Sequence, residues 1–266
     1  MAIEVFNRHE IKYILDTPTY RAIERQLAER MTLDPYLSAD QSSYRVANLY
    51  FDTDDNYLIH RSLQKPRYKE KLRLRGYGVP GPEDKVYLEI KKKISGAVNK
   101  RRSAIRLSQA VEFIRTGRLP EPEDGQNRQV LHEIAYLLQE YDLKPKLYLA
   151  YDRRAYFGRE EADLRVSFDS NIRTRRYDLA LDKGDHGEQL LPDGLWLMEI
   201  KVARSMPFWL ARLLSELQIY PTSFSKYGFE YLKMTGSQAR DQRQVSAPDW
   251  MPKPIGSLVP APVRNI

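Results

Sequence analysis

The chain contains no cysteine, which excludes disulfide bonds and thiolate metal sites. Its four histidines, His9, His60, His132 and His186, lack the spacing of a metal site, so we expect them to be structural or solvated. No run of about 18 apolar residues is present, and the first residues lack the apolar segment of a signal peptide. We therefore expect no membrane span and a cytoplasmic location.

Charge is abundant and unbalanced. Lys and Arg number 43 against 36 Asp and Glu, a formal net charge of +7. A basic chain favours anionic partners, such as nucleic acid, a membrane surface or phosphorylated small molecules. The 18 tyrosines are dispersed over expected strands and helices rather than gathered on one surface, so we expect no specific nucleic-acid partner.

Alternating apolar and charged residues predict an antiparallel fold with several helices. The predicted strands cover residues 4–16, 43–51, 68–77, 85–93, 98–107, 146–157, 163–169, 171–177 and 195–203. The predicted helices cover residues 20–30, 54–63, 109–116, 127–141, 207–217 and 226–234, with Asp54, Ser108 and Ser225 as N-caps. A stretch rich in Ser, Gln and Pro follows, so we expect a folded domain over residues 1–235 and a tail over residues 236–266.

Charged pairs recur on these strands at a spacing of two residues. Glu-x-Lys occurs three times and Arg-x-Arg once, and Arg165 and Asp169 share one face of another strand. The pairs are Glu10/Lys12, Glu89/Lys91, Glu199/Lys201 and Arg73/Arg75. Because residues i and i+2 of a strand point the same way, each pair aims two charges at one side of a sheet.

Two arrangements explain this pattern. For any single strand, a solvated outer face is the simpler explanation. Five such strands, all loaded with Arg, Lys and a few Glu, favour instead a β-barrel with charges inside and helices outside. Arg binds phosphate oxygens in a bidentate manner, and carboxylates bind Mg²⁺ or Mn²⁺, so such a wall suits a chain of phosphates.

Other basic clusters are interpreted more simply. Arg173, Arg175 and Arg176 favour a solvated strand edge, with a substrate entrance as the alternative. Lys91–Lys93 and Lys100–Arg102 flank one hairpin and are expected to form a basic rim. The stretch Tyr50–Thr53 is either a plain strand end or a place where Asp52 binds a nearby turn.

Nine motifs in a fixed order resemble the catalytic domain of the VTC polyphosphate polymerases, within the CYTH/triphosphate tunnel metalloenzyme superfamily. They lie between about Phe6 and Met234 and include Arg8-x-Glu10-x-Lys12, Leu72–Arg75, Leu88–Lys91, Tyr151-x-Arg153, Leu164–Asp169, Met198–Lys201 and Ser225–Tyr227. The resemblance implies an α+β fold with an antiparallel eight-stranded β-barrel tunnel and surrounding helices. It also implies transfer of the γ-phosphate of ATP to a growing polyphosphate chain, assisted by Mn²⁺ or Mg²⁺.

The resemblance also implies residue roles. The phosphate-binding set would be Lys12, Arg73, Arg75, Lys91, Lys100, Arg153, Arg165, Lys201, Ser225 and Lys226. Arg75, Lys91, Arg165 and Lys226 would act in catalysis, and Glu199 with Glu10 would hold the metal. The inward placement of Arg153 rests on the resemblance alone, because strict alternation groups it with Leu149, Tyr151 and Ala155.

Three functions remain open at this point. The first is an ATP-dependent polyphosphate polymerase, the second a triphosphate or phosphoanhydride hydrolase on the same fold, and the third a non-catalytic binder of polyphosphate or inositol phosphates. The expected partners are ATP and polyphosphate or other phosphate-chain anions. By analogy with eukaryotic relatives, a membrane-protein partner is also expected.

Overall fold

The computed structural model describes residues 9–37, 41–95 and 97–240. Its ten strands are β1 (His9–Asp16), β2 (Met31–Leu33), β3 (Tyr44–Asp52), β4 (Tyr68–Tyr77), β5 (Lys85–Ile94), β6 (Ala97–Arg106), β7 (Lys144–Gly158), β8 (Arg165–Arg175), β9 (Glu188–Gln189) and β10 (Leu195–Val202). Its helices are α1 (Thr17–Arg30), α2 (Tyr57–Leu63), α3 (Leu107–Thr116), α4 (Arg128–Glu140), α5 (Phe208–Glu216) and α6 (Lys226–Arg240). None of these helices is long and apolar enough to cross a membrane.

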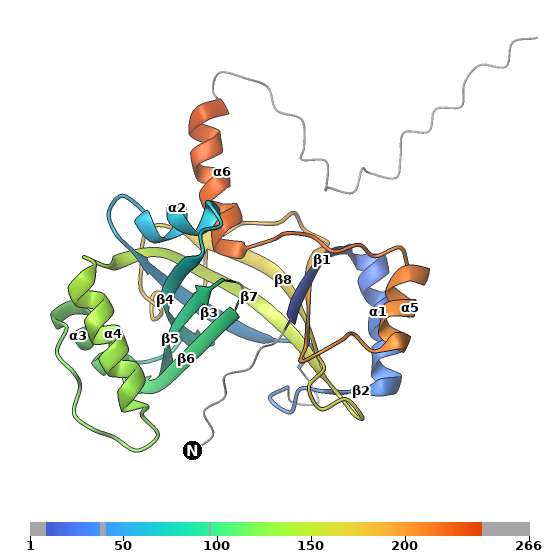
Figure 1. Cartoon of the computed structure of the whole chain (residues 1–266), viewed down its shortest axis with the longest axis horizontal. Helices are drawn as coiled ribbons and strands as arrows, with labels where there is room; N and C mark the ends of the chain where they lie inside the picture. Colours follow the sequence, from blue (N-terminus) through green and yellow to red (C-terminus); the bar gives the residue numbers. More distant parts are fainter. Residues whose placement is uncertain (1–8, 38–40, 96, 241–266) are drawn as a thin grey trace, which may run out of the picture.

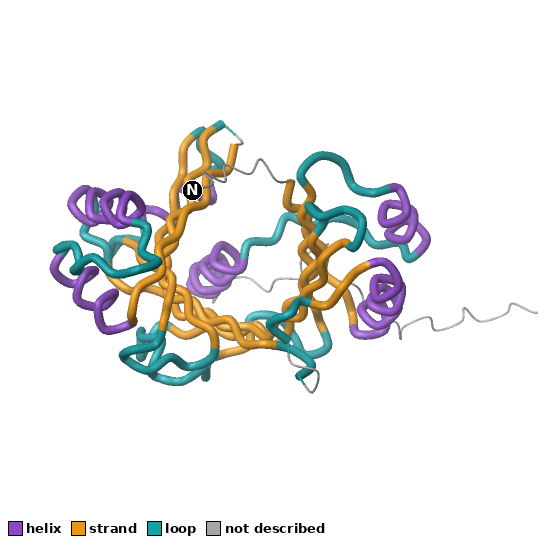
Figure 2. Tube along the Cα trace, turned by 90° about the horizontal axis from the view of Figure 1, so that it is seen from below, coloured by secondary structure: helices purple, strands orange, loops and turns teal. Residues whose placement is uncertain are grey.

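Eight strands form one continuous antiparallel path in the order β1-β10-β8-β7-β3-β4-β5-β6, and β2 and β9 add to β7 and β8. The sheet curls strongly, so that β1 and β6 face each other across the molecule (Figures 1 and 2). This confirms the α+β class and the eight-stranded antiparallel arrangement. The sheet is not closed into the expected barrel, because no pairing joins β1 to β6 among the described residues.

Helices cover the outside of the curled sheet. On one side, α1 and α5 bury the apolar face of β1, β8 and β10 in a cluster that includes Ile23, Phe168 and Leu210. On the other side, α3 and α4 pack on β4, β5 and β6, with Phe113 and Leu131 fully buried. Most apolar positions of β1, β4, β5, β8 and β10 therefore face outward under the helices, which leaves their charged positions for the inside, as alternation requires.

The third apolar cluster lies at one end of the curled sheet. Tyr227 and Phe224 of the α6 region pack there on Tyr50, Tyr151 and Leu197. In Figure 2 the helix α6 appears between the two sides of the sheet. The inner surface is thus apolar toward α6 and charged elsewhere.

The sequence predicted most elements, including β4 at its observed ends, but several details were wrong. The two strands expected over residues 163–169 and 171–177 are one strand, β8, in which Asn171 has a φ of 47°. The short strands β2 and β9 were missed. The expected caps also differ: α2 follows Asn56 rather than Asp54, and α3 follows Arg106 rather than Ser108.

The ends of the chain can be compared only in part. The expected strand over residues 4–16 is seen from His9, and its first residues lie outside the described part. Helix α6 continues to Arg240, past the expected end at Met234. The division into residues 1–235 and a tail over residues 236–266 stays a prediction, since residues 241–266 lie outside the described part.

Candidate phosphate-binding site

Cross-strand register decides which side chains share the inner face. Residues directly opposite each other on antiparallel strands point to the same side of the sheet. Lys12 is opposite Glu199, which is opposite Ser167. On the other side of the molecule, Arg73 is opposite Glu89, and Lys91 is opposite both Lys71 and Lys100. The charged pairs expected from alternation therefore do lie on one common face.

We call the inner face of β4, β5 and β6 the basic wall. Apart from Lys85 and Arg106 at the strand ends, it carries one carboxylate, Glu89, and eight cationic side chains: Lys69, Lys71, Arg73, Arg75, Lys91, Lys93, Lys100 and Arg102. We call the inner face of β1, β10, β8 and β7, with the start of α6, the carboxylate wall. It carries Lys12, Lys201, Arg165, Arg153 and Lys226 with the three carboxylates Glu10, Asp169 and Glu199.

Glu89 is the centre of the basic wall. It is 1% exposed and accepts from Arg73 at 2.7 Å and from Lys100 at 3.0 Å, with Arg75 at 3.8 Å. Burial alone would raise the pKa of Glu89, but these cations hold it well below its ordinary value. One buried carboxylate thus holds three cationic side chains in place, and the net charge of the wall remains strongly positive.

Lys71 and Lys91 form no salt bridge with a carboxylate among the described residues, although the charge of Lys91 acts on Glu10 of the carboxylate wall. They are opposite each other across β4 and β5, as are Lys69 and Lys93 one step along the strands. Like charges directly opposite in an antiparallel pair destabilise a sheet. Burial, followed by the charges of Lys91 and Lys69, lowers the pKa of Lys71 to about 7. A bound anion would relieve this repulsion.

Lys69 and Lys71 lie on the predicted strand face but were not among the expected site residues. The alternation that identified Arg73 and Arg75 extends to both lysines, so the signal was present. Lys69 donates to the carbonyl oxygen of Ser62 in α2 at 3.1 Å, at the end of this row.

The carboxylates of the other wall share cations. The ammonium of Lys226 is 2.6 Å from Asp169 and 3.0 Å from Glu199. Arg153, placed inward beside them, donates to both oxygens of Asp169 at 2.7 and 2.8 Å. Burial alone would raise the pKa of Glu199, but Lys226, Lys12 and Lys201 lower it well below its ordinary value. These carboxylates are therefore ionised at neutral pH.

The two expected metal ligands converge on one point. Lys12 places its ammonium 3.2 Å from Glu10 and 3.6 Å from Glu199. Burial and Glu199 would raise the pKa of Glu10, but Lys201, Lys12 and Lys91 outweigh them and lower it to about 2. The part of the chain described here has no group of three His, Asp or Glu residues that could hold a metal. Mg²⁺ commonly uses one or two carboxylates with phosphate and water oxygens, so this pair fits.

The remaining expected site residues are placed as follows. Arg165 and Lys201 are opposite each other on β8 and β10, and Arg165 is also 3.4 Å from the buried Asp34. Ser225 accepts from the backbone N–H of Gly228 at 3.3 Å and so caps α6, and its part in phosphate binding stays a prediction. Asp34 was missed, because it lies in a loop with no pattern to reveal it.

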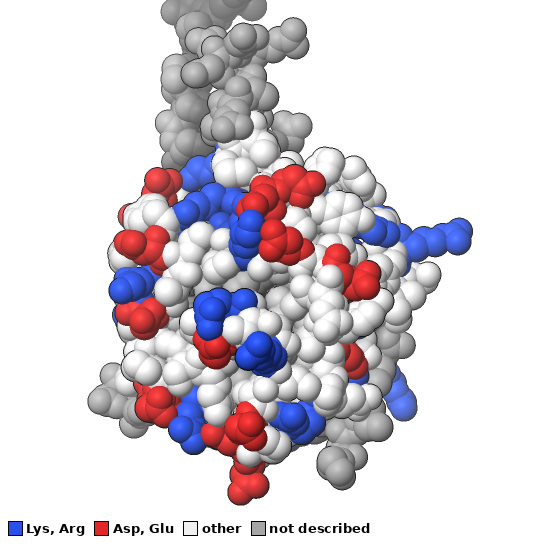
Figure 3. Space-filling model, turned by 90° about the vertical axis from the view of Figure 1, so that its left-hand side faces the viewer, with Lys and Arg blue, Asp and Glu red and all other residues white. Residues whose placement is uncertain are grey.

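The residues that were expected to form a basic rim lie on both faces of the β5–β6 hairpin. Lys91, Lys93, Lys100 and Arg102 face inward, whereas Lys92 and Arg101 face outward and both pair with Glu133 of α4. Figure 3 shows this outer side, where basic and acidic side chains are interspersed. The outer cations are thus matched by carboxylates, and the inner ones of the basic wall are not.

The expectation for Arg173 and Arg175 was wrong, because both are buried. A register shift between β7 and β8 turns them to the outer side, where Arg173 binds Asp185 at 2.8 Å. Arg175 lies 3.5 Å from the centre of the Tyr148 ring and donates to three backbone carbonyls. Both side chains therefore hold the loop that contains Asp178, Ala180, Asp185 and His186, and they do not form a solvated strand edge.

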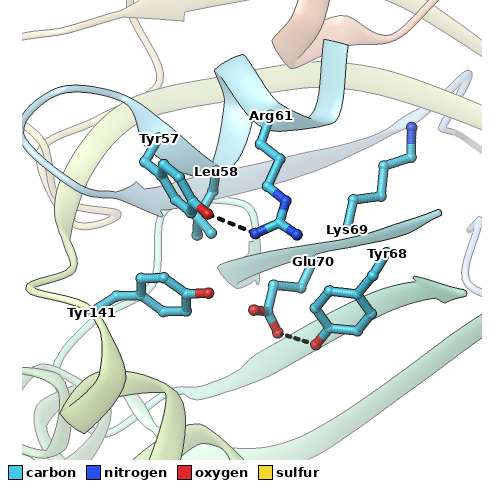
Figure 4. A pocket seen from close by; sticks show the side chains of 7 residues that line it. All are labelled: Tyr57, Leu58, Arg61, Tyr68, Lys69, Glu70 and Tyr141. Carbon is cyan, nitrogen blue, oxygen red and sulfur yellow. Dashed lines mark hydrogen bonds between the residues drawn. The ribbon is translucent and has the colours of Figure 1, made fainter. Parts of the chain in front are cut away.

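Two hollows lie elsewhere and suit phosphate less well. In Figure 4 the hydroxyl groups of Tyr68 and Tyr141 lie near the buried Glu70, and the hollow measures about 10 Å³, room for about one water. The other hollow, between α2 and α6, measures about 410 Å³ and is lined mainly by uncharged residues. The first hollow is lined by Arg61 and Lys69 but also by the carboxylate of Glu70, and it is too small for a phosphate group.

Comparisons with known proteins agree with this geometry. The VTC domain family model matches residues 7–235. Vacuolar transporter chaperone complex subunit 4 is 27% identical in Trypanosoma cruzi and 25% identical in Trypanosoma brucei brucei, each over 213 residues and 67% of this chain. The chain spans 27% of the length of each of these relatives.

A solved structure shares the fold. It is a Hippeastrum protein described as a proposed adenylyl cyclase with a dominant triphosphatase activity. The TM-score is 0.51 at 18% sequence identity, and the match covers 85% of this chain and 95% of that one. This match confirms the expected tunnel fold. Because the family model matches almost all of the described residues, the chain belongs to the VTC domain family.

Proposed function

We propose that this domain is a polyphosphate polymerase that transfers the γ-phosphate of ATP to a growing polyphosphate chain. The observation that carries the proposal is the basic wall, where eight inward cations face a single carboxylate, Glu89. A single phosphate group would neutralise only part of that charge, whereas a chain of phosphates can contact it along its length. Membership of the VTC domain family supports this choice.

In this proposal, the role of each residue follows from the wall on which it lies. Arg73, Arg75, Lys91 and Lys100 of the basic wall hold the phosphate chain, with Arg75 and Lys91 acting on the reacting phosphate. Lys12, Arg153, Arg165, Lys201 and Lys226 hold phosphates from the carboxylate wall. Phosphoryl transfer asks mainly for positioning and charge neutralisation, so no protein nucleophile is needed.

Glu199 and Glu10 are the proposed ligands of Mn²⁺ or Mg²⁺. When bound, the ion neutralises phosphate oxygens and helps to orient them for transfer. Lys12 and Lys226 contact Glu199 at 3.6 and 3.0 Å, so with a metal ion on Glu199 their ammonium groups would be available to phosphate.

One experiment separates the proposed function from its alternatives. The purified protein is incubated with ATP and Mn²⁺, and the products are resolved on a gel that detects long polyanions. We expect a long polymer and ADP. Free phosphate and ADP without polymer would contradict the proposal in favour of a hydrolase. Intact ATP together with protection of the protein from heat by polyphosphate would indicate a binding protein.

Cellular context is carried over from the relatives' names. Because they are described as subunits of a vacuolar transporter chaperone complex, we propose that this chain also works with a membrane-protein partner, on its cytoplasmic side.

A further inference from the structure

Asp52, at the end of β3, is a buried carboxylate to which the proposed function gives no role. It is fully buried and, besides a long contact of 3.5 Å from the hydroxyl of Thr53, accepts four hydrogen bonds. Three come from backbone groups, at Thr53, Leu58 and Ile59, so that Asp52 satisfies the free N–H groups at the start of α2. The fourth comes from the side chain of Tyr227, at 3.1 Å, which belongs to α6.

Tyr227 connects this capped helix to the carboxylate wall. It is 3% exposed, and its ring packs on Tyr50 with centroids 4.9 Å apart. Burial, followed by the charge of Asp52, raises the pKa of the Tyr227 hydroxyl, which therefore stays a donor. The residue directly before it is Lys226, which bridges Asp169 and Glu199.

Close packing of α2 on α6 makes this link stiff. A side chain at Gly228 would bring its Cβ within 3.2 Å of Leu63 in α2, so the glycine permits the two helices to approach. Glu230, one turn further along α6, pairs with Arg176 at 2.7 Å. The orientation of the first turn of α6 is thus fixed by contacts on both sides.

We infer that Asp52 is a positioning residue that acts through Tyr227 to hold α6 with Lys226 in reach of Asp169 and Glu199. The role of Lys226 in phosphate binding rests on the proposed function, but its position does not. Before α6, the chain is also held by Lys12, which donates to the carbonyl oxygen of Phe224 at 3.0 Å. That contact fixes the approach to the helix, whereas Asp52 fixes the helix itself.

The test is a double-mutant cycle on the affinity for tripolyphosphate, measured by calorimetry without metal. Tyr227→Phe removes only the hydroxyl and leaves the three backbone contacts of Asp52 intact. We expect it to weaken binding about fivefold, the factor for one lost hydrogen bond. Lys226→Ala should weaken binding more. In the Lys226→Ala background, Tyr227→Phe should cost less than about twofold further.

A matched control separates positioning from loss of stability. Asp16 caps α1 on the outside of the sheet, accepting from the backbone of Thr19 at 2.9 Å. Asp16→Ala should lower the melting temperature as a lost helix cap does, yet leave tripolyphosphate affinity unchanged. Asp52→Ala should resemble Tyr227→Phe in binding but with a larger loss of stability.

The outcomes are distinct. The inference would be overturned if the loss of tripolyphosphate affinity in the double variant equalled the product of the losses in Tyr227→Phe and Lys226→Ala. It would also be overturned if Tyr227→Phe bound tripolyphosphate as tightly as the wild type. Polymer synthesis is measured in parallel, where Tyr227→Phe should raise the KM for ATP more than it lowers kcat. If no variant and no wild-type protein makes polymer while the binding effects remain non-additive, the proposed function fails and the positioning role stands.

Discussion

The two walls of the curled sheet use charge in opposite ways. On the carboxylate wall, Glu10, Asp169 and Glu199 share four cations, Lys12, Arg153, Lys201 and Lys226, and each carboxylate contacts at least two of them. On the basic wall, Glu89 alone faces eight cations, and Lys71 and Lys91 form no salt bridge with a carboxylate in the described part. One wall is nearly balanced within itself, and the other requires an anion from outside.

This difference suggests a division of labour. A balanced wall can exchange its internal cation contacts for a metal ion and phosphate without a large change in net charge. An unbalanced wall gains electrostatic energy from any polyanion that covers it. We therefore expect metal-assisted chemistry beside Glu199, where Arg75 and Lys91 would reach the reacting phosphate from the opposite wall, and retention of the phosphate chain along the rest of the basic wall.

The largest effect should follow from Glu199→Gln, which removes the charge proposed to bind the metal but keeps the shape. We expect metal-dependent polymer synthesis to fall at least about 100-fold, because a bound metal contributes several kcal/mol of charge stabilisation. Far-ultraviolet circular dichroism should show an unchanged fold. The measurement is initial rate against Mn²⁺ concentration.

Glu89→Gln is the matched change on the basic wall, since Glu89 is also a buried carboxylate with three cationic neighbours. We expect this variant to keep the same dependence on Mn²⁺, whatever its rate. If both variants lost metal dependence equally, the assignment of the two walls would be wrong. Unchanged synthesis in Glu199→Gln would remove Glu199 from the metal site.

A smaller effect should distinguish the two faces of β5. Lys91→Gln removes an inward cation without a carboxylate partner, so we expect affinity for long polyphosphate to fall about three- to tenfold, as for one charge-assisted contact. Lys92→Gln, on the next residue, removes an outward cation that pairs with Glu133. It should leave the affinity within about twofold. Equal losses, measured by calorimetry, would show that general charge and not the wall binds the chain.

The sequence was informative where regular strands carry the site. Alternation alone placed Arg73, Arg75 and Lys91 on one face, since a strand repeats every two residues whatever lies around it. Alternation gave the wrong face where the two-residue period of a strand is interrupted. Arg173 faces outward because β7 and β8 shift register near Ala150, and no local pattern signals such a shift.

Contacts between distant segments were also beyond the sequence. Asp52 was expected at most to bind a nearby turn, and it does cap α2, but its bond to Tyr227 joins residues 175 positions apart. Lys226 was identified only by family resemblance, and its bridge between Asp169 and Glu199 depends on how α6 enters the sheet. Such tertiary contacts are set by packing rather than by periodicity.

The smallest predicted effect concerns pH and the basic wall. Burial and neighbouring cations lower the pKa of Lys71 from 10.5 to about 7, and burial lowers that of Lys100 to about 7 despite Glu89. Between about pH 7 and pH 10.5, both lysines are protonated in the unfolded chain but have largely lost their protons in the folded chain. The free energy of unfolding should therefore rise with pH over this range. The rise should be about 1 kcal/mol per pH unit or less for each lysine, because solvent screens both groups.

Urea denaturation at about pH 7, 8 and 9 measures this slope. Lys71→Gln should flatten it, whereas Lys92→Gln, on the outer face, should not. Tripolyphosphate should also flatten it, because a bound anion restores the proton on Lys71 and so removes the difference between the folded and unfolded chains. An identical slope in wild type and Lys71→Gln would mean that the repulsion between the opposed lysines is already relieved in the free protein, and the contrast between the two walls would then lose its energetic basis.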